Sequence, residues 1–313
     1  MKQNRIDLPL ISIIVPSKNE QDDIALTLEL ILAIDYPNKE IIVVDDSNDD
    51  TPKIVQSYKD KGVKLVHRET NNDGCCGARN AGMRIAEGEI LVIMNADVRP
   101  EKDFLDLILR HHQNGADYLV VRSKAMNANN IWGNLVAAKE NYHVQYLAND
   151  EWSEGFSCKR DAAIKVGFIP GKFPVNFCRD VMFGANLKKA GYTKVVDPSI
   201  IMKHIVPEKF SDFWRERIWR GTFSSLTYYY FTKKNIPIIL VREILKFIRT
   251  ILKILLIFPK FIQSFKLSKY SANGYKDFFK IYFASIIEDL ALTVGNFKGF
   301  KMLLATVKDQ KNK

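Results

Sequence analysis

Short apolar runs alternate with segments of helical periodicity through the first hundred residues of the chain. The apolar runs cover residues 10–15, 40–44, 63–66 and 89–94, and the helical segments between them cover residues 22–34, 52–58 and 78–86. Runs of this length predict buried strands, and their alternation with helices is typical of βαβ units on a mostly parallel sheet. We therefore predict a Rossmann-like α/β domain, with helices flanking the sheet, at the start of the chain.

The pattern continues in a looser form as far as residue 204. We expect a helix from residue 100 to about 114, a strand over residues 118–121, helices over 132–146 and 180–190, and a strand and turn over 195–204. The segment EWSEGFSCK at residues 151–159 places glycine and small residues between aromatic ones. This composition favours a loop where the backbone approaches a ligand closely.

The composition changes near residue 210, where the chain becomes helical, basic and aromatic. Residues 205–313 contain 20 Lys and Arg against 8 Asp and Glu, whereas the first 204 residues contain 26 against 28. The net charge of +10 is therefore a property of the C-terminal third, which could meet nucleic acid, anionic lipid or only water. The four cysteines lack metal-finger spacing and no apolar secretory signal precedes residue 8, so we expect a reduced, cytosolic setting.

A basic stripe characterises one helix of the C-terminal third. Arg242, Lys246, Arg249 and Lys253 fall within about 60° of one another on a helical wheel, and Ile, Leu, Val and Phe cover the remaining surface. Such a helix suits the plane of a membrane interface, with its cations toward lipid headgroups. The alternative is a solvated face on a helix that packs against the rest of the protein. Interleaved aliphatic residues, rather than exposed aromatic ones, favour lipid over nucleic acid.

No uncharged apolar stretch of about 18 residues occurs in the C-terminal third, so a membrane-spanning helix is not supported. The apolar segment at residues 278–297 is interrupted by Glu288 and Asp289. We expect this segment to be interfacial or buried against its neighbour.

Polar residues come directly after the predicted strands, at residues 16–20, 45–50 and 95–97. Ligands of open α/β sheets bind beyond the carboxyl ends of the strands. Asp97 ends the run ILVIMNAD and is followed by Pro100, which predicts a rigidly held carboxylate. Because Mg²⁺ is commonly bound by one or two carboxylates and substrate phosphate oxygens, Asp97 is a candidate metal ligand. Capping of the next helix is the alternative for this residue.

Three segments, ISIIVPSKNE, IIVVDDSNDDT and GARNAGMRIAEGEILVIMNAD, occur in this order and together resemble the family 2 glycosyltransferases. The resemblance covers residues 10–100 and extends more weakly to about residue 221. It implies the GT-A fold and inverting transfer from a nucleoside diphosphate sugar, with UDP favoured. By this resemblance we expect a catalytic domain over residues 1–210, with a donor half at about 1–100 and an acceptor half at about 101–210. A helical, membrane-associating segment would follow at residues 211–313.

The resemblance also implies a donor site. Its residues would be Pro16 and Asp46 at the nucleobase, Arg79 at the diphosphate, and Glu20, Asn95 and Asp97 at the nucleotide sugar. Asn95 stands where the family usually has aspartate, and its amide can still form hydrogen bonds to a ribose hydroxyl. The loss of one negative charge would lower the affinity for a metal. Asp97 and His204 would bind the divalent cation, Mn²⁺ or Mg²⁺; an ordinary histidine after a strand is the alternative for His204.

On the acceptor side, the resemblance carries the catalytic base to Asp180, at the start of a helix. Arg179 stands where the family more often has glutamate. Gly155 would belong to the acceptor loop, where Trp152 or Phe156 could stack on a sugar. Arg217 and Arg220, in RERIWRGTF, loosely resemble an arginine-tryptophan helix that meets the diphosphate or lipid headgroups. The alternatives are helix capping for Asp180 and a surface position for Arg79.

The leading hypothesis is therefore an inverting, metal-dependent glycosyltransferase that acts peripherally at the cytoplasmic face of a membrane. It would transfer one sugar to a hydroxyl of a glycan or lipid-linked acceptor, and we expect no nucleic-acid partner. One alternative changes the acceptor to a polyprenyl phosphate, which needs no base. Others are a sugar nucleotidyltransferase and a degenerate homologue that only binds a partner at the membrane.

Overall fold

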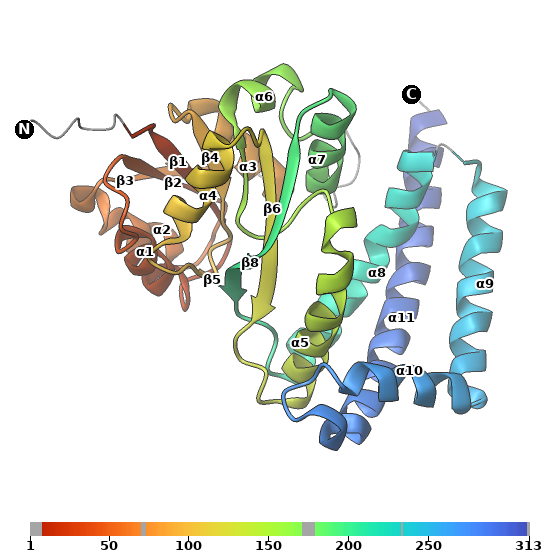
Figure 1. Ribbon diagram of the computed structural model, residues 1–313. Coiled ribbons are helices and arrows are strands. Elements are labelled where there is room, and N and C mark those ends of the chain that lie inside the picture. Colours follow the sequence, from red (N-terminus) through yellow and green to blue (C-terminus); the bar gives the residue numbers. More distant parts are fainter. Residues whose placement is uncertain (1–7, 70–72, 171–178, 233, 312–313) are drawn as a thin grey trace, which may run out of the picture. The chain divides into compact units, whose positions relative to one another are not determined.

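A computed structural model describes residues 8–69, 73–170, 179–232 and 234–311 (Figure 1). The chain divides into two compact units, each considered separately below. Of the described residues, the first unit comprises those within 8–123, 145–170 and 179–204, and the second comprises those within 124–144 and 205–311. The helix Ile131–His143 therefore belongs to the second unit, whereas the expected catalytic domain, residues 1–210, included it.

The strands in chain order are β1 (Ile11–Ser17), β2 (Lys39–Asp45), β3 (Val63–His67), β4 (Ile90–Ile93), β5 (Val98–Arg99), β6 (Tyr118–Ala125), β7 (Phe156–Lys159) and β8 (Lys194–His204). The helices of the first unit are α1 (Ile24–Leu32), α2 (Thr51–Gln56), α3 (Gly74–Ile85), α4 (Phe104–Gln113), α6 (Arg160–Lys165) and α7 (Arg179–Lys189). Those of the second unit are α5 (Ile131–His143), α8 (Phe210–Thr232), α9 (Ile236–Leu255), α10 (Phe258–Ser268) and α11 (Phe278–Lys311). Single 3-10 turns lie at Lys59–Lys61, Val144–Asn149 and Gly274–Asp277.

Among the described residues, eight strands form one sheet in the order β3-β2-β1-β4-β7-β6-β8-β5. The first four strands in this order run parallel to one another, as the sequence pattern predicted. β7 pairs antiparallel with both β4 and β6, and β5 pairs antiparallel with β8. The sheet is therefore mixed, and the prediction of a mostly parallel sheet is correct only for its first half.

The predicted loop at residues 151–159 is wrong for its last four residues, which form β7 in the middle of the sheet. Phe156, Ser157 and Cys158 are all buried, because helices cover both faces of the sheet at this point. The residues Phe-Ser-Cys-Lys do alternate between apolar and polar side chains, but four residues are the shortest run in which alternation indicates a strand. The glycine directly before this run favoured a loop instead.

Helices cover both faces of the sheet in the first unit. Ile11, Ile13 and Val15 of β1 pack with residues of α1, α2 and α4, whereas Ile14 of the same strand packs with residues of α3. Burial of each such side chain contributes about 1.5–3 kcal/mol. This double cover explains the uninterrupted apolar runs in the sequence, and it leaves the carboxyl ends of β1 to β4 free to carry polar residues.

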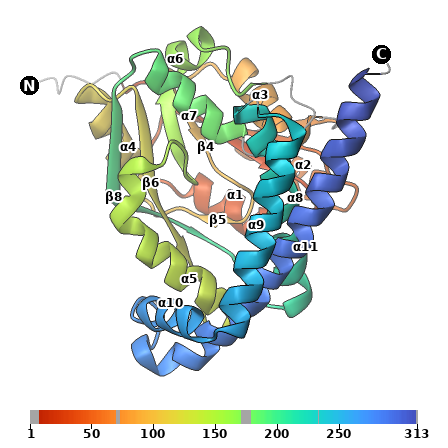
Figure 2. The same ribbon diagram turned by 90° about the vertical axis from the view of Figure 1, so that its right-hand side faces the viewer.

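In the second unit, α8 and α11 lie side by side (Figure 2). Their backbones approach closely at glycines: a Cβ on Gly295 would lie 2.2 Å from the carbonyl oxygen of Ile218 and 2.8 Å from the Cα of Gly221. A Cβ on Gly299 would lie 1.9 Å from the carbonyl oxygen of Thr222. Only glycine permits this contact. Small residues four apart are also typical of helix pairs that pack in membranes.

The basic stripe of α9 differs from the expectation. Arg242 and Lys246 form ion pairs with the buried Glu243, and Lys253 lies 4.0 Å from a carboxylate oxygen of Asp289 on α11. Of the four stripe residues, only Arg249 is exposed, and the other three are half-buried. Three of the four cations therefore point toward carboxylates inside the helical unit rather than outward to headgroups. Their attraction to the buried carboxylates accounts for this orientation.

The acidic pair in α11 also lies inside the second unit. Glu288 is 3% exposed and forms ion pairs with Lys139 and Arg217. Asp289 accepts a 2.7 Å bond from Lys260, which is 2% exposed. Of the two expectations for residues 278–297, these contacts favour burial against a neighbour.

None of the helices in the described part of the chain is both long enough and apolar enough to cross a bilayer.

Gly295→Ala tests the close contact of α8 and α11. Alanine raises intrinsic helix propensity by about 1 kcal/mol, but its methyl group would overlap a backbone carbonyl. We predict a net loss of about 1–3 kcal/mol in the free energy of unfolding, measured by chemical unfolding followed by circular dichroism. The exposed neighbour Val294→Ala is the control and should change stability by no more than about 0.5 kcal/mol. A Gly295→Ala protein as stable as the wild type would contradict this packing.

Candidate active site

A buried arginine on α3 connects three separate segments of the first unit. Arg79 is 5% exposed; its Nη1 donates to Oδ2 of Asp180 at 2.8 Å, and its Nη2 donates to Oδ1 of Asn95 at 3.0 Å. Its guanidinium also lies 5.2 Å from the ring centre of Trp152. One guanidinium thus fixes the end of β4, the start of α7 and the loop before β7.

The charge of Arg79 is stabilised by its partner. Burial lowers the pKa of Arg79, but the charge of Asp180 together with smaller contributions from Glu154 and other neighbours outweighs this effect, and the pKa rises above its usual range. Loss of one partner would leave an unpaired buried charge, which costs about 3–5 kcal/mol. Asp180 itself is less enclosed, with 19% of its side chain exposed, so a ligand can reach it.

One donor of Arg79 is not used within the described residues. Its Nε is buried and has no hydrogen-bond acceptor there. A buried N–H without a partner costs about 1–3 kcal/mol, so an oxygen of a bound ligand would relieve this cost. Nε is therefore a donor that the predicted contact with a diphosphate could use.

The position of Asn95 explains why a neutral side chain is compatible with the site. Its amide oxygen accepts a hydrogen bond from Arg79 but carries no charge that competes with Asp180. An aspartate at this position would place a second carboxylate about 3 Å from the same guanidinium. Because Asn95 is neutral, it does not compete with Asp180 for the positive charge of Arg79. The sequence alone did not indicate this relation.

The structure brings the two predicted metal ligands together. β5 pairs antiparallel with β8, and Val98 lies opposite His204 in this register. Asp97, the residue before β5, is therefore next to His204 at the edge of the sheet. Burial raises the pKa of Asp97, and the charge of His204 opposes this rise.

Two further carboxyl groups surround Asp97. Burial, together with the charge of Asp97, raises the pKa of Glu20 to about 8. Burial also raises the pKa of Glu154 to about 7, although the charge of Arg79 opposes it. Sequence reasoning predicted Glu20 but missed Glu154, whose place beside the predicted loop glycine Gly155 was the available signal. The surroundings of Asp97 at the edge of the sheet thus contain more carboxyl groups than basic side chains.

A divalent cation suits this excess of carboxyl groups. Asp97 offers a carboxylate and His204 an imidazole, both common ligands of Mn²⁺. Among the residues that the structure describes, no three His, Cys, Asp or Glu side chains converge on a metal position. Substrate oxygens would therefore complete the coordination, as is usual for cations bound with diphosphates.

The predicted nucleobase residues lie at the ends of neighbouring strands. Pro16 is buried in β1, opposite Val44 of β2, and Asp46 follows β2 directly. The carboxylate of Asp46 accepts bonds from Nε and Nη2 of Arg68 at 2.7 and 2.6 Å. Arg68 follows β3 directly, so the strand-end rule that selected Asp46 would also have found it.

The acceptor-side predictions have different outcomes. Trp152 stacks on Phe156 at 4.5 Å, and Phe156 is fully buried, so of this pair only Trp152 can reach a sugar. Gly155 has φ +77°, and a Cβ there would lie 2.9 Å from Cζ of Phe104 in the core. The glycine is thus required by the fold, and its contact with an acceptor stays a prediction. The side chain of Arg179 and residues 171–178 lie outside the described residues.

The two arginines of α8 form ion pairs within the second unit. Arg217 is 6% exposed and its Nε lies 3.5 Å from Glu288. Arg220 donates to Glu216 at 2.6 Å and is exposed. Burial of Arg217 in an ion pair differs from the expected contact with headgroups; the contact with a diphosphate stays a prediction for both.

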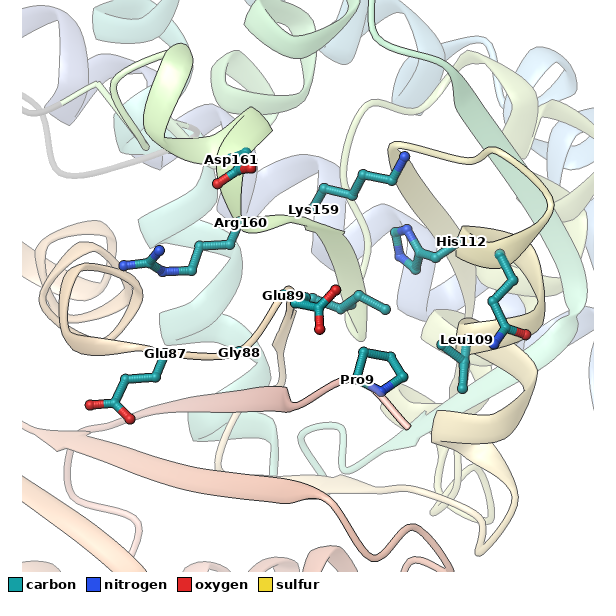
Figure 3. A pocket seen from close by; sticks show the side chains of 11 residues that line it. Pro9, Glu87, Gly88, Glu89, Leu109, His112, Lys159, Arg160 and Asp161 are labelled. Carbon is teal, nitrogen blue, oxygen red and sulfur yellow. The ribbon is translucent and has the colours of Figure 1, made fainter. Parts of the chain in front are cut away.

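A separate cavity of about 320 Å³ lies at the opposite ends of β1 and β4 (Figure 3). Its basic side chains already have partners: Lys159 pairs with Asp117, and Arg160 donates to the carbonyl of Ala86. His112 is bonded through both ring nitrogens, and burial lowers its pKa to about 4. These contacts indicate a structural hollow rather than a reactive site.

Sequence comparison assigns the chain to a family. Residues 12–168, half of the chain, match the model of Glycosyl transferase family 2. Poly(ribitol-phosphate) beta-N-acetylglucosaminyltransferase TarS of Staphylococcus aureus is 34% identical over 128 residues, which are 38% of this chain and 22% of that protein. UDP-Glc:alpha-D-GlcNAc-diphosphoundecaprenol beta-1,3-glucosyltransferase WfgD of Escherichia coli is 30% identical over 142 residues, 45% of this chain and 56% of that protein. The chain thus spans only part of the curated relatives it matches.

Solved structures share the fold. The mannosyltransferase PcManGT of Pyrobaculum calidifontis, in complex with GDP-Man and Mn²⁺, gives a TM-score of 0.56 at 19% identity and covers 97% of this chain and 81% of that one. Residues 1–349 of S. aureus TarS with UDP-GlcNAc give 0.52 at 16% identity, covering 91% and 90%. The fold is the GT-A fold of glycosyltransferases, as predicted. The family match over half its length shows that the chain belongs to glycosyltransferase family 2.

The raised carboxyl pKa values predict a pH dependence of stability. Because the pKa of Glu154 is about 7 in the folded chain and 4.5 otherwise, its contribution is fully present below pH 4.5 and is lost as the pH rises through 7. Without divalent metal, we expect the midpoint of thermal unfolding to fall between about pH 5 and about pH 8, and Glu154→Gln to flatten this fall. Glu87→Gln, at an exposed position, should leave the wild-type slope unchanged. Equal slopes in all three proteins would show that Glu154 titrates normally.

Proposed function

We propose that the chain transfers one sugar, with inversion, from a nucleoside diphosphate sugar to a hydroxyl of a glycan or lipid-linked acceptor at the cytoplasmic face of a membrane. A UDP-sugar is the favoured donor. The observation that carries this proposal is the arrangement around Arg79, which holds Asp180 beside Asn95 at the edge of the sheet where Asp97 meets His204.

Asp180 is the proposed base. Its Oδ2 accepts the bond from Arg79, and its Oδ1 accepts one from the backbone N–H of Val181 at 2.9 Å. These two bonds fix the orientation of the carboxylate, and each oxygen keeps a lone pair for the proton of an acceptor hydroxyl. As the proton leaves, the hydroxyl oxygen bonds to the anomeric carbon and the bond to the diphosphate breaks on the opposite side. A base within hydrogen-bond reach contributes about 10²–10⁴-fold to such a step.

Asp97 and His204 would hold the divalent cation, Mn²⁺ or Mg²⁺. When bound, the cation would neutralise charge on the departing diphosphate. The nearby residues prepare this position: burial disfavours the charged form of Asp97, so a cation would gain from pairing with it. The Mn²⁺ in the PcManGT complex supports the proposal of a metal.

The proposed substrates draw support from the names of relatives. TarS has been solved with UDP-GlcNAc, and WfgD is named for transfer from UDP-Glc to a diphosphoundecaprenol-linked sugar. The apolar and basic helical unit supports a membrane location, which suits a lipid-linked acceptor.

Asp180→Asn tests the base. The amide can still accept the bond from Arg79 but cannot take a proton, so we expect kcat to fall by about 10²–10⁴-fold while the Kd for the donor changes no more than about threefold. Nucleoside diphosphate release measures the first quantity, and calorimetry with Mn²⁺ measures the second. Asp60→Asn, on an exposed turn, is the control for loss of a carboxylate. Normal turnover by Asp180→Asn would instead favour a polyprenyl phosphate acceptor, since phosphate needs no base.

A donor panel tests the activity itself. The wild-type protein should release nucleoside diphosphate from one of a set of UDP- and GDP-sugars in the presence of Mn²⁺ and a membrane extract, and EDTA should stop the release. Asp97→Asn should weaken metal-dependent donor binding at least about tenfold because it removes the charged ligand. Metal-independent binding of every donor, without turnover, would indicate a degenerate homologue that serves only as a binding protein.

A further inference from the structure

One face of α10 is apolar and exposed. Phe258, Phe261, Ile262 and Phe265 recur at offsets of three, four and seven, which places them on a face about 100° wide. Their exposed fractions are 69%, 42%, 40% and 47%. Exposed apolar residues also lie at the end of α9, directly after it and at the start of α11, namely Leu252, Leu255, Leu256, Ile257, Phe279 and Phe283. A patch of this kind on a helical unit marks a binding surface.

The buried side of α10 is largely polar: it holds Lys260, Ser264 and Ser268 together with Leu267. Lys260 is 2% exposed and bonds to Asp289, and Ser264 lies 3.1 Å from Ser285 through their hydroxyl oxygens. With the inward cations of α9, this reverses the arrangement of a helix in water, where apolar residues point inward and charges outward. Charged groups that point inward and pair with one another are the rule where helices contact lipid.

Charge decides between lipid and a second copy of the chain as the occupant. Residues 205–313 contain 20 Lys and Arg against 8 Asp and Glu, so two such surfaces would repel each other. Exposed lysines lie on and beyond α10, at Lys266, Lys269, Lys276 and Lys280. An anionic bilayer attracts each of these by about 1 kcal/mol near its surface.

A basic pocket lies next to this apolar face. Its volume is about 350 Å³, and it is lined by Lys139, Tyr142, His143, Gln263, Lys266 and Leu267. No carboxylate is among these residues. Lys139 is held in place by its ion pair with Glu288, and Lys266 and Gln263 lie on the sector of α10 beside the Phe residues. An anion bound here would keep its attached apolar chain close to Phe265.

We propose that the α9–α10 corner inserts its apolar residues into the acyl-chain region of an anionic bilayer, and that the pocket between α5 and α10 binds the phosphate of a membrane phospholipid. This builds on the proposed action at a membrane. It corrects the expected mode of binding, because the contact is made by the apolar side of α9 and α10 rather than by the basic stripe.

Vesicle cosedimentation of the full chain tests the insertion. We expect binding to vesicles of phosphatidylcholine with phosphatidylglycerol, with a part that persists in high salt because apolar groups are buried. Phe258→Asp should lower the partition coefficient at least about tenfold, whereas Leu26→Asp, at an exposed leucine of α1, should leave it unchanged. Since no donor or acceptor is used, this result is independent of whether glycosyl transfer occurs.

Two outcomes would overturn the insertion. The first is equal vesicle binding by the wild type and Phe258→Asp while circular dichroism shows both to be folded. The second is a dimer in sedimentation velocity that Phe258→Asp dissociates, without any vesicle binding, which would identify a second copy as the occupant.

Lys266→Glu and Lys269→Glu separate the pocket from general electrostatics. Both variants change the charge equally on the same surface, but only Lys266 lines the pocket. With short-chain phosphatidylglycerol below its micelle concentration, we expect saturable binding by the wild type and Lys269→Glu, and at least about tenfold weaker binding by Lys266→Glu. Equal binding by the two variants, or binding of inorganic phosphate or a polyprenyl phosphate in preference to the phospholipid, would refute the proposed lipid site.

Discussion

The candidate site depends on one buried guanidinium. Arg79 has two side-chain hydrogen-bond partners, Asp180 and Asn95, which lie on segments far apart in the sequence. Because a buried charge without a partner is costly, this arginine requires α7 and the end of β4 to stay in place. The proposed base Asp180 and Asn95, two residues before the proposed metal ligand Asp97, are therefore held in one arrangement. The neutral Asn95 belongs to this arrangement, because its amide oxygen accepts a hydrogen bond from Arg79 without competing with Asp180 for the positive charge.

The helical unit buries several paired charges beside its apolar clusters, and it leaves many large apolar side chains exposed. Glu288 and Asp289 pair with cations from neighbouring helices, whereas Glu243 pairs with Arg242 and Lys246 of its own helix. Glycines bring α8 and α11 into backbone contact. A bilayer would cover the exposed apolar side, whereas water leaves it uncovered. The proposed binding of a diphosphate sugar by the first unit and the proposed entry of the helical unit into lipid together suit an acceptor carried on a membrane.

Much of the first unit could be predicted from the sequence because its signals are local. The apolar runs of β1 to β4 and the polar residues after each strand gave the parallel half of the sheet and placed Asp97 at its edge. Contacts between distant segments gave no such signal: the bond from Arg79 to Asp180 joins residues 101 positions apart. The antiparallel strand β7 was taken for a loop because its pairing with β4 and β6 also joins segments that are distant in the sequence. The basic stripe of α9 was found, but a helical wheel does not tell which side faces the protein.

The structure of the chain in complex with UDP and Mn²⁺, determined by crystallography, would test the central claim most directly. We predict Mn²⁺ bonded to the carboxylate of Asp97 and the imidazole of His204, and Arg79 still within about 3 Å of Asp180 while its Nε contacts the nucleotide diphosphate. A cation bound elsewhere with Asp97 turned away, or Arg79 moved onto the diphosphate with Asp180 released, would contradict this arrangement.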